Sequence, residues 1–100
     1  MASETALQAR IRKALLREYP GAVMWKIHGG PSQAAGIPDL LGCIEGRLVG
    51  LEVKLPGGSH PVSSIQEAQL SAIRRAGGIA AVVRGTREAL DVVAEGLASG

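Results

Sequence analysis

The chain has 100 residues, of which 46% are hydrophobic, and it carries a formal net charge of +2. We expect one small globular domain over residues 1–100, and the apolar content excludes a disordered chain. The mild basicity permits a nucleic-acid partner without requiring one. The single cysteine, Cys43, excludes an intrachain disulfide and a metal site built from several cysteines.

Hydrophobic periodicity and the positions of glycine and proline predict the elements of the chain. They are, in chain order, a helix over 4–18 with Ser3 as its N-cap, a strand over 22–27, a hairpin over 38–55, a helix over 64–76, a strand over 79–83 and a helix over 86–97. The helix over 64–76 is a crossover, so the strand after it should run parallel to its neighbour. We therefore expect an α/β fold with a mixed sheet flanked by helices, in the order αβββαβα.

The predicted hairpin turns at residues 45–46, Glu-Gly, between two apolar strands. A two-residue turn places Ile44 opposite Arg47. Continuing that register places Asp39 opposite Glu52, with their Cβ atoms about 5 Å apart. A register slip of one residue would instead put the two acids on opposite faces of the sheet.

Lys54 shares a face with Glu52 because strand side chains alternate. Like charges that face each other across strands destabilise a sheet. A hard divalent cation between Asp39 and Glu52 would remove that penalty, since Mg²⁺ takes carboxylates together with waters and phosphate oxygens. The alternative is that Lys54 neutralises the two acids as a structural ion-pair cluster.

Other polar residues have two possible roles each. Glu4 either complements the dipole of the first helix or points toward the sheet. Gln66 either closes a capping box with Ser63 or points inward on the face of Leu70. Lys26 contacts phosphate or solvent.

The basic residues of the first helix form a solvated face or meet a phosphate backbone; among them are Arg10 and Lys13. His28 is expected to be a surface histidine, with phosphate binding as the alternative. The remaining assignments are to packing: Cys43 as a small buried hydrophobe, and Trp25 and Tyr19 as packing residues rather than platforms for bases.

Several segments together resemble a known family. Pro38-Asp39 and Glu52-Val53-Lys54 on a hairpin framed by helices resemble the PD-(D/E)xK nuclease superfamily. The segments 36–42, Ser63-Ser64-Ile65-Gln66 and Gly77-Gly78 are similar to those of its virus-type replication-repair (VRR-NUC) nucleases. The resemblance extends from about Glu4 to Leu90 and implies a restriction-endonuclease-like core.

The resemblance also implies roles for individual residues. The implied ligands of Mg²⁺ or Mn²⁺ are Glu4, Asp39, Glu52 and the main-chain carbonyl of Val53. The implied catalytic set is Asp39, Glu52, Lys54 and Gln66, with Lys54 acting on the attacking water. The loop from His28 to Gly36 departs from the pattern: it is glycine-rich with no basic residue before Gly36, which leaves open how DNA is gripped on that side.

The implied activity is metal-dependent hydrolysis of DNA phosphodiester bonds by an endonuclease, acting as a homodimer on branched DNA such as four-way (Holliday) junctions. One alternative is a non-cleaving nucleic-acid-binding module of the same fold. Another is a small assembly protein whose acids form an ion-pair cluster. We expect no organic cofactor and no membrane partner. Because residues 1–5 do not begin a secretory signal, we expect a cytoplasmic location in a bacterium or a phage-infected host cell.

Overall fold

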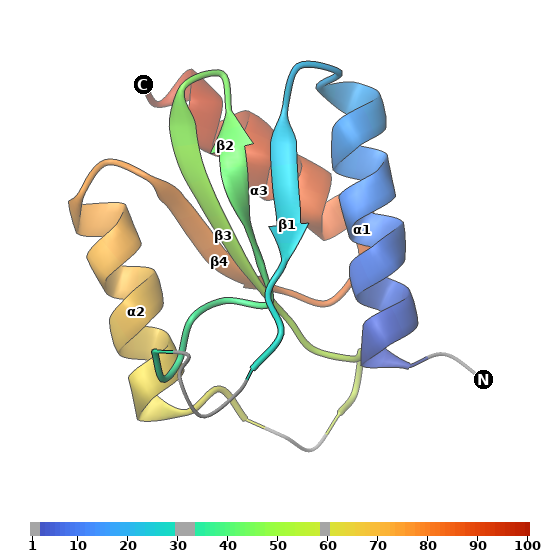
Figure 1. Cartoon of the computed structure of the whole chain (residues 1–100), viewed down its shortest axis with the longest axis vertical. Coiled ribbons are helices and arrows are strands. Elements are labelled where there is room, and N and C mark those ends of the chain that lie inside the picture. The colour runs from blue at the N-terminus through green and yellow to red at the C-terminus, as the bar shows by residue number, and fades with distance from the viewer. Residues whose placement is uncertain (1–2, 30–33, 59–60) are drawn as a thin grey trace.

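Three helices surround a four-stranded sheet in the computed structural model, which describes residues 3–29, 34–58 and 61–100 (Figure 1). The elements are α1 (Glu4–Glu18), β1 (Val23–Lys26), β2 (Leu40–Ile44), β3 (Arg47–Val53), α2 (Ser64–Arg75), β4 (Ile79–Val83) and α3 (Thr86–Ala98). The strand order is β1-β2-β3-β4, with β1, β2 and β3 antiparallel in turn and β4 parallel to β3. The predicted class, element order and mixed sheet are confirmed.

Side-chain caps fix where two of the helices begin. Ser3 Oγ accepts a hydrogen bond of 3.0 Å from the N–H of Ala6 at the start of α1, as predicted. Ser63 caps α2, whose path from the end of β3 to the start of β4 makes the last two strands parallel. No helix in the described part of the chain has the length and apolar character needed to cross a membrane.

The β2–β3 hairpin has the predicted two-residue turn. Glu45 and Gly46 both have positive φ values, 50° and 79°, as the tight hairpin turn that matches strand twist requires. Ile44 pairs with Arg47, and the same register continues to Leu40 opposite Leu51. The pairing therefore carries the predicted alignment to the end of the hairpin.

The two faces of the sheet are covered by different helices. Leu51 and its alternate neighbours on β3 are fully buried against the apolar faces of α1 and α3. On the opposite face, the Ile73 side chain of α2 lies so close to Gly50 that a Cβ there would be 2.9 Å from it. α2 thus packs directly over β3 and covers the face toward which Glu52 also points.

The outer face of β1 and β2 carries no helix, and here two predictions are wrong. Cys43 is exposed rather than buried. Trp25 is 58% exposed and is not a packing residue, whereas Tyr19 does pack against the core. Trp25 follows the buried Met24 in β1, and Cys43 lies between the buried Gly42 and Ile44 in β2. Because strand side chains alternate, Trp25 and Cys43 point away from α1 and α3.

Candidate active site

Two carboxylates meet at the end of the hairpin. Asp39 directly precedes Leu40, which pairs with Leu51, so Asp39 stands opposite Glu52. In place of the next ladder bond, the N–H of Val53 donates a hydrogen bond of 2.9 Å to Asp39 Oδ2. The predicted juxtaposition of the two acids is therefore present in the structure.

Glu52 is almost entirely removed from solvent, with only 3% of its surface exposed. Its Oε2 accepts a hydrogen bond of 3.0 Å from Gln66 Nε2 and lies 3.8 Å from Lys54 Nζ. Its other oxygen, Oε1, is buried and has no hydrogen-bond partner among the described residues. In the ionised carboxylate, one oxygen is therefore satisfied by the described residues and the other is not.

Burial raises the pKa of Glu52 from 4.5 to about 7, and the neighbouring Asp39 charge adds to the rise. Once Glu52 is protonated, its carboxyl donates to Asp39, which raises the pKa of Glu52 further, while Lys54 acts in the opposite direction. The pair therefore holds a second negative charge poorly unless a cation joins it.

Gln66 fills both of the roles that the sequence left open. Its backbone N–H donates to Ser63 Oγ at 3.1 Å, and its own Oε1 accepts from the Ser63 N–H at 3.0 Å, which completes a capping box. The remaining Nε2 donates to Glu52. One amide thus ties the start of α2 to the buried acid and fixes which oxygen of Glu52 faces the helix.

The segment before Asp39 is held against α2. Gly36 has a φ of +80° and lies so close to Ile65 that any Cβ would meet it at 2.5 Å. Gln69 Nε2 donates to the Ala35 carbonyl at 3.2 Å, and Pro38 is buried. These contacts set the position of the Asp39 side chain. The rest of the glycine-rich loop, residues 30–33, lies outside the described residues.

The structure does not add Glu4 to the pair. Within the described ranges, no three His, Cys, Asp or Glu side chains are placed to hold one metal ion. Glu4 begins α1 at the end of the sheet where β1 and β3 finish (Figure 1). Val53, whose main-chain carbonyl is another implied ligand, directs its N–H to Asp39. Strand geometry directs the Val53 carbonyl to the same side as that N–H.

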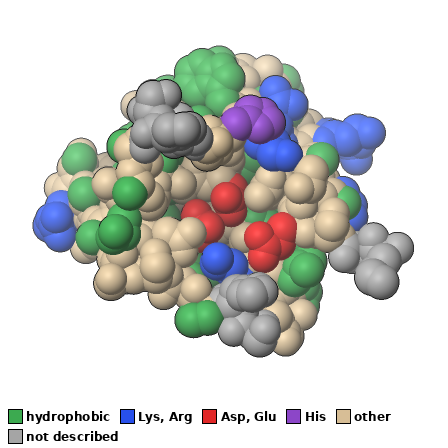
Figure 2. All heavy atoms as spheres, turned by 60° about the horizontal axis from the view of Figure 1, so that its bottom comes forward, with side chains coloured by type: hydrophobic (Ala, Val, Ile, Leu, Met, Phe, Trp, Pro, Cys, Tyr) green, Lys and Arg blue, Asp and Glu red, His purple; other side chains and the backbone are tan. Residues whose placement is uncertain are grey.

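The charged side chains gather on one face. Figure 2 shows acidic side chains in a hollow of this face, with a lysine or arginine group beside them and further basic groups at its rim. Lys26 and Arg12 line one cavity beside α1, whereas Arg10 and Lys13 are exposed on α1 and do not line it. The sequence interpretation named Lys26 individually and Arg12 only as one of the charges of the first helix, and DNA contact by Lys26 stays a prediction.

The donor set fits a divalent metal. Two carboxylates lie side by side, one oxygen is buried without a partner, and burial disfavours the bare negative charge. Oxygen donors of this kind are the ligands that Mg²⁺ and Mn²⁺ prefer. Lys54 beside the pair supplies only one positive charge at 3.8 Å.

The strand order and the mixed sheet are consistent with a restriction-endonuclease-like fold. A solved structure called "VRR_NUC domain" matches with a TM-score of 0.61 and 22% identity, over 85% of this chain and 91% of that one. Another, called "VRR_NUC domain protein", matches with a TM-score of 0.69 and 18% identity, over 99% of this chain and 91% of that one. No family model matches the sequence. No curated protein matches it either. The chain therefore has the fold of VRR_NUC domains, which confirms the predicted resemblance at the level of fold.

Proposed function

We propose that this protein is a divalent-metal-dependent DNA endonuclease. The observation that carries the proposal is the buried, unpartnered Oε1 of Glu52 beside Asp39. A buried acceptor without a partner lowers stability, and such a group is retained where a ligand satisfies it. The fold shared with VRR_NUC domains supports the same interpretation.

Asp39, Glu52 and the Val53 carbonyl would hold Mg²⁺ or Mn²⁺, with Glu4 as an accessory acid at the same end of the sheet. When bound, the metal supplies Lewis acidity and lowers the pKa of its water. Gln66 keeps Glu52 Oε2 engaged at 3.0 Å, so that Oε1 stays directed away from the helix. Neither ligand carboxylate then needs to reorganise when DNA arrives.

Lys54 acts on the reacting groups themselves. Its side chain is only 12% exposed and its ammonium is held 3.8 Å from Glu52 Oε2. An ammonium there donates hydrogen bonds to a water or a phosphate oxygen and counters the negative charge that develops on the phosphate. Removing it leaves the acid pair in place but takes away this stabilisation.

The proposed substrate is DNA, with branched molecules such as four-way junctions as the preferred class. The basic residues of α1 and β1 supply phosphate contacts, namely Arg10, Lys13 and Lys26. Cutting two strands symmetrically requires two copies of the site, so the proposed assembly is a homodimer with two-fold symmetry. Light scattering tests this assembly, and a monomeric mass at working concentration would contradict it.

The test of the function is cleavage of a labelled panel containing a four-way junction, a flap, a duplex and a single strand. We expect cutting in Mg²⁺ or Mn²⁺ and none in chelator, with the preferred substrate identifying the class. If every substrate stays intact while binding is the same in chelator and metal, the protein is a non-cleaving binding module. If DNA neither binds nor is cut, the acids are an ion-pair cluster.

A further inference from the structure

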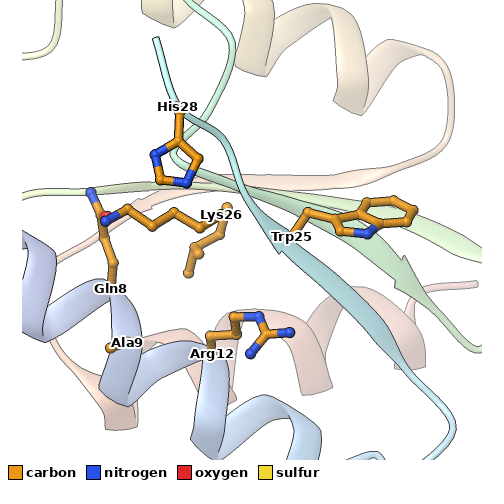
Figure 3. A pocket seen from close by; sticks show the side chains of 7 residues that line it. Gln8, Ala9, Arg12, Trp25, Lys26 and His28 are labelled. Carbon is orange, nitrogen blue, oxygen red and sulfur yellow. The ribbon is translucent and has the colours of Figure 1, made fainter.

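A cavity of about 420 Å³ lies between α1 and the free edge of β1. Its lining residues are Gln8, Ala9, Arg12, Trp25, Lys26, His28 and Leu40. Figure 3 shows Gln8 reaching from α1 and Lys26 from β1 toward one another, with Arg12 also on α1 and the Trp25 ring extending away from them on the other side of β1. Its volume falls within the range of about 300–1,000 Å³ that is usual for small-molecule sites.

Gln8 is the most informative residue in this cavity. It is 7% exposed, and its Oε1 is buried without a hydrogen-bond partner among the described residues. It replaces an apolar residue on the inner stripe of α1, next to Leu7 and three residues before Ile11. A side-chain amide carries two donors and an acceptor, which matches the hydrogen-bonding edge of a nucleobase.

The other polar groups of the cavity are two cations and a histidine. Arg12 Nε donates to the Met24 carbonyl at 2.7 Å, which anchors the guanidinium at the edge of β1 and leaves its terminal nitrogens for other acceptors. Lys26 ends β1 and His28 follows two residues later, and none of the described residues that line the cavity is acidic. This combination suits a phosphate group.

The cavity borders the acid pair. Lys26 pairs with Leu40, the residue directly after Asp39, and the Ile27 N–H donates to the Asp39 carbonyl at 2.8 Å. Trp25, more than half exposed, lines the cavity at β1, and its ring lies on the outer side of that strand, away from α1. Aromatic side chains that line a basic groove stack on the bases of single strands.

We propose, on the basis of the nuclease function above, that this cavity receives an unpaired nucleotide of the DNA strand next to the cleaved phosphodiester. Gln8 reads the edge of its base, Lys26 with Arg12 binds the adjoining phosphate, and Trp25, exposed on the other side of β1, stacks on a neighbouring base of the strand. A paired base cannot enter because its hydrogen-bonding edge and both faces are occupied in the duplex. The cavity therefore selects DNA with unpaired nucleotides at a branch or an end.

Trp25 is the sole tryptophan of the chain, so intrinsic fluorescence reports on DNA that binds at the β1 side of the cavity. We would titrate a short oligothymidylate, the same strand with abasic sites, a blunt duplex and thymidine monophosphate, all in chelator. Chelator removes cleavage from the measurement, so a failure of binding is distinguished from a failure of the nuclease proposal. The test variants are Lys26→Gln and Gln8→Met, and Arg87→Gln on α3 is the charge-matched control.

We expect saturable quenching by the oligothymidylate and weaker binding by the abasic strand and by the duplex. Thymidine monophosphate should bind weakly, since it brings only one nucleotide. Lys26→Gln and Gln8→Met each lose one hydrogen bond to a charged or buried group. Each substitution should therefore weaken binding of the oligothymidylate about tenfold. Arg87→Gln should bind as the parent protein does.

Equal quenching by duplex and single strand would overturn the proposal, as would equal affinity of Lys26→Gln and Arg87→Gln. Quenching that depends on protein concentration instead of DNA would place Trp25 in a contact between copies of the chain and would also overturn it. Circular dichroism of each variant verifies the fold. If Gln8→Met does not fold, Lys26→Gln alone decides, because its side chain is only partly buried.

Discussion

Replacing Glu52 by glutamine should stabilise the metal-free protein at alkaline pH. Glutamine has the same shape, keeps an oxygen that can accept from Gln66, and can donate toward Asp39 as the protonated acid does. The pKa of Glu52 is raised from 4.5 in its ordinary state to about 7 in the fold. At 1.36 kcal/mol per unit, ionising this buried acid lowers the free energy of unfolding by about 3 kcal/mol.

The direction in which stability changes with pH follows from proton binding at Glu52. Between pH 4.5 and about 7 the folded protein binds a proton at Glu52 that the unfolded chain has lost. Stability from this group is therefore fully present below pH 4.5 and falls as pH rises to about 7. The Glu52→Gln variant lacks this fall, so it should match the parent protein in acid and exceed it by up to about 3 kcal/mol above neutrality.

Urea unfolding at acidic and alkaline pH, in chelator, measures the difference. Glu95→Gln in α3 is the matched control, since Glu95 is exposed and should show no such pH-dependent gain. In Mn²⁺ the order should reverse, because a ligand that binds only the folded parent protein stabilises it. If Glu52→Gln is no more stable than the parent at alkaline pH, or if Mn²⁺ stabilises both equally, the reasoning about the acid pair is refuted.

Further predictions concern other residues. Lys54→Ala should abolish cleavage but leave Mn²⁺ binding, measured by calorimetry, within about threefold, because it removes charge stabilisation and not a ligand; full activity would refute its role. Gln8→Met should raise the free energy of unfolding by about 1 kcal/mol, because it removes a buried, unpartnered oxygen; a loss of stability in urea would mean that this oxygen is satisfied in solution. Arg47→Ala should lower stability by about 2 kcal/mol in the same assay, since its guanidinium donates to the Gly77 and Gly96 carbonyls and ties the turn after α2, and α3, to β3. Arg87→Ala, which breaks only an exposed ion pair with Asp91, is its control and should change stability by less than about 0.5 kcal/mol; an equal loss in both would contradict the account.

The acid pair could be predicted from the sequence because local rules determine it. A turn with glycine at residue 46 sets the hairpin length, and strand periodicity then aligns Asp39 with Glu52. Gln66 was predicted to have one of two roles, and it has both, because its carbonyl and amide groups serve different partners. A sequence pattern identifies a capping box but does not show where the unused amide nitrogen points.

The exposed face of the sheet and the cavity beside α1 could not be predicted in this way. Alternation along β1 shows that Trp25 and Met24 face opposite sides, but which side α1 and α3 cover depends on long-range packing. Gln8 carried a weak signal, as a polar residue on the apolar stripe four residues after Glu4. Its place opposite Lys26 exists only once the helix packs beside the strand.

The rate of DNA cleavage as a function of Mn²⁺ concentration, compared for the parent protein, Asp39→Asn and Glu95→Gln, tests the central claim most directly. The claim is that Asp39 and Glu52 hold the metal that cleavage requires. It predicts saturable, Mn²⁺-dependent cutting by the parent protein and Glu95→Gln, and a loss of at least about a hundredfold in Asp39→Asn. Cutting by Asp39→Asn at the parent rate, or by the parent protein in chelator, would contradict it.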